Sequence, residues 1–122
     1  MQRKWLFFRH KLFRYREVEQ EIARRPGVTR LLDVGCGTGA ITAELARRCR
    51  GTVTGVDLDP ERVAFARQFA PQVQFEQGDV LALSYPDGRF DVVCCHFLLL
   101  WVQDAVRAVS EMARVTRQGG SV

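Results

Sequence analysis

Short apolar runs alternate with longer stretches of helical periodicity along most of the chain. Apolar runs of this length are typical of buried parallel strands rather than half-exposed ones. They predict four strands, at residues 30–34, 52–56, 73–75 and 90–96. The apolar residues of the intervening stretches recur at helical spacing. They predict three helices, one from Thr38 to about Arg50, one that begins with Pro60 after a capping Asp59, and one from Asp104 to Gly119 and Gly120.

The order of these elements indicates the fold class. Strands that alternate with helices of roughly ten residues or more require right-handed crossovers, which predicts an α/β fold with a mainly parallel sheet and helices on both faces. Ligands in such sheets bind at the carboxyl ends of the strands, where the strand order reverses. Asp33 to Gly39, Asp57, and Gly78 with Asp79 all fall at predicted strand ends. We expect them to converge on one crevice.

The first 26 residues form a separate, basic segment. Helical spacing places five apolar or aromatic side chains on one face, namely Trp5, Phe8, Leu12, Tyr15 and Ile22. Of the net charge of +4, residues 1–26 carry +5, from eight Lys or Arg against three Glu, and the remaining residues carry −1. We expect an amphipathic basic helix within residues 1–26, ended by Pro26 and Gly27, and a ligand-binding domain over residues 27–122.

This helix has three interpretations. Its aromatic face can pack over the domain and cover the crevice, with the basic side chains in solvent. Basic residues interleaved with aromatic ones can also lie on an anionic membrane surface or bind nucleic acid. Packing over the domain is the favoured interpretation, peripheral membrane contact stays open, and nucleic acid is the least favoured partner.

Composition narrows the class of protein further. A chain of 122 residues with 47% hydrophobic and 26% charged residues fits one compact globular domain. The N-terminal apolar run is too short for a signal peptide or a membrane span. Four cysteines, at 36, 49, 94 and 95, show neither paired metal-ligand spacing nor the density of a disulfide scaffold. We therefore expect reduced thiols, no metal and a cytoplasmic location.

A glycine-rich turn follows the first predicted strand. Gly35, Gly37 and Gly39 let the backbone approach a ligand closely, as in many nucleotide sites. Residues 35–40 also satisfy the dinucleotide pattern, so a nicotinamide-dependent oxidoreductase stays open. Asp33 disfavours that alternative, because a carboxylate beside the turn would repel a pyrophosphate. It suits the ammonium group of a sulfonium amino acid, whose own carboxylate can meet the N-terminus of the following helix.

Two further acidic residues lie at strand ends. Asp57 closes the second predicted strand, where a carboxylate can accept two hydrogen bonds from a ribose diol. Gly78 and Asp79 follow the third strand, where a short acceptor can bind the exocyclic amine of adenine or simply form a turn. These positions indicate a nucleoside, without naming it.

Five segments resemble the motifs of class I, Rossmann-like S-adenosylmethionine-dependent methyltransferases. They are Leu31 to Gly39 for the first motif, Gly55 to Pro60 for the second, Phe75 to Val80 for the third, Phe90 to Val93 for the fourth strand, and Arg114 to Gly120 for the lead into a fifth. The similarity covers about residues 28–120 and is greatest to the small-molecule subgroup, which includes ubiquinone-biosynthesis and sterol-type enzymes. The resemblance implies S-adenosylmethionine as cofactor and methyl transfer to a small, apolar or aromatic acceptor.

The resemblance also implies which residues hold the cofactor. They are Asp33 with Gly35, Cys36, Gly37, Thr38 and Gly39 for the methionine part, Asp57 for the ribose, Leu58 for one face of the adenine, and Gly78, Asp79 and Val80 for the adenine edge. His96, at the end of the fourth strand, completes the set. Cys36 would meet the ligand through its backbone and would not act as a nucleophile.

No catalytic residue stands out, which fits a reaction that mainly needs two reactants held together in a dry site. His96 is the candidate for taking a proton from the acceptor, although a histidine at a strand end is more often structural. Family members that methylate amide or adenine nitrogens carry an Asn/Asp-Pro-Pro-aromatic motif where this chain has residues 95–98, Cys-His-Phe-Leu. The apolar run Phe97 to Val102 either lines an acceptor pocket or packs in the core. Aminopropyl transfer and binding of the cofactor without transfer also stay open.

The end of the chain departs from the family pattern. The resemblance implies seven strands, and the chain ends at Ser121 and Val122, where we expect the fifth strand to begin. The predicted fold therefore lacks the C-terminal strands of the full domain. The fourth strand would then be an unpaired edge, which favours self-association through it.

Overall fold

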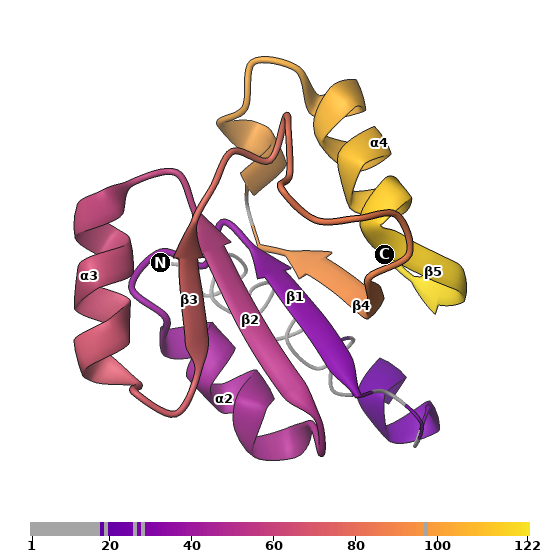
Figure 1. The fold of residues 1–122 in the computed structure, drawn as a ribbon, viewed down its shortest axis with the longest axis horizontal. Coiled ribbons are helices and arrows are strands. Elements are labelled where there is room, and N and C mark those ends of the chain that lie inside the picture. Colours follow the sequence, from indigo (N-terminus) through magenta and orange to yellow (C-terminus); the bar gives the residue numbers. More distant parts are fainter. Residues whose placement is uncertain (1–17, 19, 26, 28, 97) are drawn as a thin grey trace, which may run out of the picture.

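A five-stranded parallel sheet forms the centre of the molecule (Figure 1). The computed structural model describes residues 18, 20–25, 27, 29–96 and 98–122, and the structural statements below concern these residues. The strands are β1 (Arg30–Val34), β2 (Thr52–Asp57), β3 (Gln74–Gln77), β4 (Phe90–Cys95) and β5 (Thr116–Ser121). Their order is β3-β2-β1-β4-β5, and all four neighbouring pairs are parallel. The predicted α/β fold is confirmed.

Helices cover both faces of this sheet (Figure 1). They are α2 (Ala40–Arg48), α3 (Pro60–Phe69) and α4 (Ala105–Val115), and a 3₁₀ turn, η1 (Leu98–Leu100), follows β4. Leu45 of α2 packs with Leu31 of β1, whereas Met112 of α4 packs with Leu32. Because successive residues of a strand point to opposite faces, α2 and α4 lie on opposite sides of β1. The α3 helix shares the side of α2, since its Val63 belongs to a cluster that includes residues of both helices.

The expected N-terminal helix lies mostly outside the described residues. Residues 20–24 are helical, and Ile22 belongs to the core beneath α2. The Ser121 hydroxyl donates a 2.7 Å hydrogen bond to the Glu21 carboxylate, which ties the end of this segment to β5. The division of the chain at residue 26 stays a prediction. No helix in the described part of the chain is long and apolar enough to cross a membrane.

The C-terminal segment differs from the expectation. The last helix ends at Val115 and does not reach Gly119 or Gly120. Thr116–Ser121 instead form β5, which pairs in parallel with β4. The expectation that the chain stops before a fifth strand is therefore wrong. Self-association through an unpaired fourth strand loses its premise as well, because β4 lies between β1 and β5.

Two glycines explain how this segment approaches β4. Gly119 has a φ of +77°, which residues with a side chain disfavour. A Cβ atom on Gly120 would stand 2.5 Å from the carbonyl oxygen of Asp91 in β4. The pairing is irregular between Phe90 and Val92, which accommodates this close passage. In the sequence these glycines look like a helix end, whereas in the fold they belong to a strand.

A buried carboxylate joins the amino ends of three strands. Asp91 of β4 accepts 2.9 Å hydrogen bonds from the backbone N–H groups of Thr29 and Arg30 beside β1, and a 2.7 Å bond from the Arg117 guanidinium of β5. Burial alone would raise the pKa of Asp91, but these donors hold it well below its usual value. The ionised carboxylate therefore stabilises the end of the sheet opposite to the cavity described next.

Candidate cofactor site

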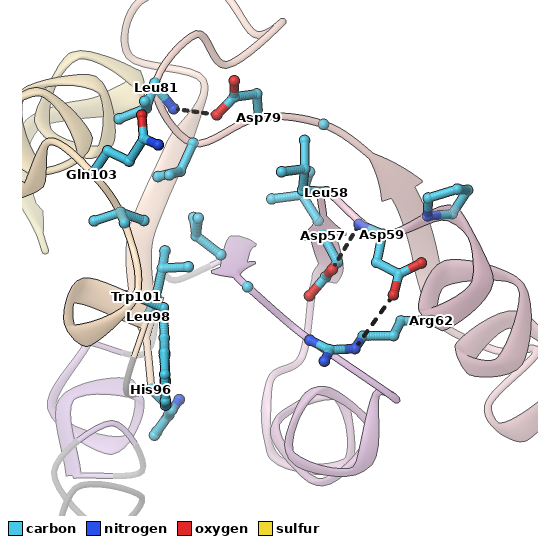
Figure 2. Close-up of a pocket in the computed structure, with 17 residues that line it drawn as sticks. Asp57, Leu58, Asp59, Arg62, Asp79, Leu81, His96, Leu98, Trp101 and Gln103 are labelled. Carbon is cyan, nitrogen blue, oxygen red and sulfur yellow. Dashed lines mark hydrogen bonds and ion pairs between the residues drawn. The ribbon is translucent and has the colours of Figure 1, made fainter.

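A cavity of about 1100 Å³ opens at the carboxyl ends of β1, β2 and β4 (Figure 2). The strand order reverses between β1 and β4, so this is the position at which parallel sheets bind ligands. The lining comes from residues 34–35, 56–60, 62, 78–81, 96, 98 and 101–103. Figure 2 shows two facing walls, with Asp57 and Leu58 on one side and Leu98 and Trp101 on the other. Each of the three predicted strand-end segments contributes to this cavity, the first through Gly35, the second through Asp57 and the third through Gly78 and Asp79.

The predicted site residues divide into those that line the cavity and those that do not. The lining includes Gly35, Asp57, Leu58, Gly78, Asp79, Val80 and His96. The other predicted residues, Asp33, Cys36, Gly37, Thr38 and Gly39, are not part of the lining, and Thr38 is exposed. Position in or outside the lining does not test whether a residue binds a ligand, so these binding roles stay predictions.

The glycine turn is fixed to the end of β2. The backbone N–H groups of Gly35 and Cys36 both donate to the carbonyl oxygen of Val56, at 2.7 and 3.0 Å. Gly39 starts α2 with a φ of +86°, and a Cβ atom there would lie 2.7 Å from the ring of Phe75. Only glycine fits this position, because it combines a left-handed backbone with direct contact to an aromatic ring. The turn is therefore a rigid support for the cavity.

Asp57 closes β2 with a fixed orientation. One carboxylate oxygen accepts a 2.9 Å hydrogen bond from the N–H of Gly37, and the other accepts a 2.9 Å bond from the N–H of Asp59. Each carboxylate oxygen has two lone pairs, so both oxygens can still accept a ligand hydroxyl. The arrangement suits a diol such as that of ribose.

Asp33 lies behind the cavity floor. Its side chain is buried, and one of its oxygens accepts a 2.8 Å hydrogen bond from the Thr42 hydroxyl of α2. Burial raises the pKa of Asp33 to about 7, and the nearby Asp57 adds to the rise while the Thr42 bond opposes it. A buried carboxylate of this kind favours a positive charge nearby. The predicted interaction with an ammonium group fits this chemistry and stays a prediction.

His96 lines the cavity and lies beside Asp33. Both ring nitrogens are buried, and Nδ1 lies 4.0 Å from a carboxylate oxygen of Asp33. A base must reach the proton that it removes. This geometry favours the structural interpretation of His96 over the catalytic one.

Cys36 is half-buried beside the two carboxylates. Burial raises the pKa of its thiol to about 12, and the charges of Asp33 and Asp57 add to the rise. The thiol therefore stays protonated at neutral pH, which agrees with the expectation that it is not a nucleophile. Its backbone N–H already donates to Val56, so a contact with a ligand would need another atom of the residue.

The segment after β3 forms the third wall. Asp79 is exposed, and its carboxylate accepts a 2.9 Å hydrogen bond from the N–H of Leu81. Gly78 is bonded to the carbonyl oxygen of Asp57 and packs so closely on β2 that a Cβ atom would lie 2.8 Å from the Val56 side chain. This wall therefore places an acceptor side chain near the Asp57 wall.

Sequence reasoning missed part of the lining. Arg62 lies in the first turns of α3, five residues after Asp57, and a period of 3.6 could have placed it near the cavity. Of the described residues in this run, Leu98 packs against the core and also lines the cavity, and Trp101, which is 84% exposed, lines the cavity too. An acceptor pocket formed by this run stays a prediction. No sequence pattern predicts Gln103 in the lining, because its position depends on where η1 ends.

The fold and the cavity define a class. A parallel sheet of order β3-β2-β1-β4-β5, a glycine turn after β1 and an acidic residue after β2 together define a Rossmann-like nucleoside-binding domain. The sequence profile described as the methyltransferase domain matches residues 32–122. The chain therefore belongs to this family, the class I S-adenosylmethionine-dependent methyltransferases. The oxidoreductase alternative loses its support.

Individual relatives agree with this family. The chain is 37% identical over 118 residues to the ubiquinone/menaquinone biosynthesis C-methyltransferase UbiE of Bdellovibrio bacteriovorus, which covers 93% of this chain and 49% of that protein. It resembles CalS10, an S-adenosylmethionine-bound amino pentose methyltransferase from Micromonospora echinaspora, with a TM-score of 0.69, 36% identity, and coverage of 81% and 43%. It also resembles the [4+2]-cyclase SpnF, with a TM-score of 0.77, 33% identity, and coverage of 84% and 40%. The chain spans between about a third and a half of the length of its curated relatives.

Proposed function

We propose that the chain binds S-adenosylmethionine in the cavity and supports methyl transfer to a small, apolar or aromatic acceptor. The observation that carries this proposal is the pairing of two unlike walls. Asp57, with both oxygens already oriented by backbone donors, stands on one side, and Leu98 and Trp101 stand on the other. A polar cofactor end and an apolar acceptor end fit these walls.

The residues present fit this cofactor. Asp57 would accept the ribose hydroxyls, and Leu58, which is 66% exposed, would cover one face of the adenine. Asp79 would accept from the exocyclic amine. Asp33, buried and with a pKa of about 7, would stabilise the positive end of the methionine part from behind the floor. When bound, the cofactor supplies a methyl group on a good leaving group, so the protein has mainly to position and to exclude water.

The acceptor assignment rests on the exposed apolar wall. Trp101 is 84% exposed beside the cavity, although an exposed tryptophan of this size would otherwise favour burial. An apolar or aromatic acceptor would cover it. The name of the UbiE relative, a ubiquinone/menaquinone methyltransferase, supports an acceptor of that kind. The name of CalS10 supports small acceptors more broadly.

Calorimetric titration of the chain with S-adenosylmethionine and S-adenosylhomocysteine tests the cofactor assignment. Asp57→Asn keeps the shape of the side chain but replaces one acceptor oxygen by a donor nitrogen. It should weaken binding about 100-fold, because hydrogen bonds to a charged acceptor are lost and one backbone N–H that orients the side chain loses its partner. Glu61→Gln, at an exposed position of α3 outside the lining, is the matched control and should bind normally. A folded wild-type chain that binds neither ligand would contradict the proposal.

A second candidate is cofactor binding without methyl transfer. The buried nitrogens of His96 favour it for acceptors that must lose a proton to a base of the protein. The [4+2]-cyclase among the similar structures also supports other chemistry on this fold. Tight cofactor binding, without product from a panel of quinols, phenols and amines, would favour this candidate. Labelled methyl transfer to any of them would favour the first.

Location and contacts beyond the cavity stay proposals. The four cysteines form no disulfide among the described residues, which supports a cytoplasmic location, where disulfides are rare. Peripheral membrane contact through the expected basic N-terminal helix concerns residues that lie mostly outside the described part. Sedimentation of the chain with anionic and neutral vesicles would test that contact.

A further inference from the structure

The α4 helix carries a polar stripe that faces the segment after β3. Arg107, Glu111 and Arg114 are spaced by four and three residues, so they lie on one side of the helix. The segment that they face, residues 79–87, runs between β3 and β4 with little regular structure. It contributes Asp79, and residues 80 and 81, to the cavity lining.

The stripe binds this segment at alternate residues. The contacts are Arg107 Nε to the Leu81 carbonyl at 2.8 Å, the Leu83 N–H to Glu111 at 2.9 Å, and Arg114 to the carbonyls of Leu83 and Tyr85, each at 2.8 Å. These backbone groups are ones that a neighbouring strand would normally bind. Side chains of α4 therefore replace a strand as the partner of this extended segment.

The two central members of the stripe hold each other in place. Arg114 Nε donates a 2.6 Å hydrogen bond to the Glu111 carboxylate. This bond, opposed in part by desolvation, lowers the pKa of Glu111, so both side chains are charged at neutral pH. Arg107 acts on Glu111 through its charge, whereas its side-chain hydrogen bond goes to the Leu81 carbonyl, the contact of the stripe nearest to Asp79 in the sequence. We expect its removal to leave the Glu111–Arg114 hydrogen bond in place.

We propose that Arg107 is a positioning residue for the adenine end of the site. By holding the Leu81 carbonyl, it fixes a turn in which the Leu81 N–H binds the Asp79 carboxylate and the Ala82 N–H binds the Asp79 carbonyl. The orientation of the Asp79 carboxylate thus depends on a side chain 28 residues further along the chain. This inference rests on the proposed function, in which Asp79 accepts from the exocyclic amine.

The test compares two ligands that differ only at that amine. The first is S-adenosylhomocysteine, and the second is its purine analogue with hydrogen in place of the amino group. The wild-type chain should prefer the first about tenfold, the usual worth of one good hydrogen bond. Arg107→Met should reduce this preference to about threefold or less, mainly by weaker binding of S-adenosylhomocysteine. Arg107→Lys should recover part of it, because an ammonium group can still donate to the Leu81 carbonyl.

Arg47→Met is the matched control. Arg47 is an exposed arginine of α2 that pairs with Glu44 and lies outside the lining, so its loss should leave the preference unchanged. An Arg107→Met chain that binds with the wild-type preference would overturn the inference. A variant that weakened both ligands equally would also overturn it, since that result indicates a general loss of structure.

Hydrogen exchange separates this inference from the proposed function. In the ligand-free chain, Arg107→Met should speed exchange of the Leu81 and Ala82 amides several-fold, with the amides of β1 and β2 unchanged. Unchanged exchange at these two amides would overturn the inference even if cofactor binds. If the wild-type chain bound neither ligand, the proposed function would fail, and exchange alone would decide whether Arg107 holds the segment.

Discussion

Replacing Asp33 by asparagine is expected to stabilise the ligand-free chain at pH 8 while weakening cofactor binding. Asp33 is buried, and its hydrogen bond from the Thr42 hydroxyl can be kept by an amide oxygen. The substitution therefore removes the charge and changes little else. Burial raises the pKa of Asp33 from 3.8 to about 7, so its carboxylate is ionised at pH 8 despite the cost of burying that charge.

The pH range follows from the direction of this pKa shift. The folded chain binds the Asp33 proton more tightly than the unfolded chain. The contribution of this proton to the free energy of unfolding is therefore complete below about pH 4 and is lost as pH rises to about 7. The difference between 3.8 and about 7 corresponds to a limit of about 4 kcal/mol. Relaxation around a buried charge reduces such costs, so we expect Asp33→Asn to gain about 1–3 kcal/mol at pH 8 and little at pH 4.

Urea unfolding followed by circular dichroism measures this difference. Other titratable groups face Asp33, namely His96 and Cys94 of the β4 end, Asp57 of the β2 end and Cys36 of the glycine turn. The quantity to compare is therefore the difference between wild type and variant at each pH, with Glu61→Gln as control. The same difference at pH 4 and pH 8, or a less stable variant at pH 8, would refute the reasoning.

Cofactor binding should change in the opposite direction. An ammonium charge near Asp33 favours the ionised carboxylate, so wild-type affinity for S-adenosylhomocysteine, which carries that group, should rise with pH between 5 and about 7 and then level off. Asp33→Asn should bind more weakly and lose this rise. A variant that keeps the rise would show that Asp33 is not its source.

Three further predictions concern the sheet and the cavity. Gly39→Ala should lose about 2 kcal/mol or more in urea unfolding and most cofactor affinity, because its φ is +86° and its Cβ would meet Phe75 at 2.7 Å. Asp91→Asn should lose about 2 kcal/mol at pH 7, and only the wild type should lose that stability as pH falls below about 4, as pH titration of unfolding can check. Trp101→Ala, at an 84% exposed position, should leave unfolding unchanged within about 0.5 kcal/mol but raise the KM for a naphthoquinol probe several-fold.

The elements that depend on local sequence could be predicted. The structure confirms β1 at residues 30–34 and extends the second predicted strand by one residue, to Asp57. Asp59 caps α3 as expected, since its carboxylate accepts a 2.9 Å hydrogen bond from the Glu61 N–H. Such signals lie within a few residues of the element that they define, which is why a single sequence is sufficient for them.

The features that depend on distant partners could not be predicted. The β5 strand contains two glycines and no apolar run, and its pairing depends on contacts with Asp91, which lies 26 residues before Arg117. The contact from Arg107 to Leu81 likewise spans 26 residues. The face of the sheet on which Asp33 lies could be predicted, because side chains alternate along a strand. Asp33 shares the face of Leu31, opposite to that of Val34, which lines the cavity. Its distance from the glycines in the sequence does not predict this face.

Two buried aspartates in neighbouring strands show how the sheet separates stability from binding. Asp91, at one end, accepts from two backbone N–H groups and an arginine, so its pKa is low and its charge holds β1, β4 and β5 together. Asp33, at the other end, accepts one side-chain hydrogen bond from the described residues, that of the Thr42 hydroxyl, and burial raises its pKa to about 7. A buried carboxylate with so few donors lowers the stability of the ligand-free chain, and a cationic ligand can stabilise its charge. The expected gain in stability of Asp33→Asn and its expected loss of binding are therefore two results of the same missing donors.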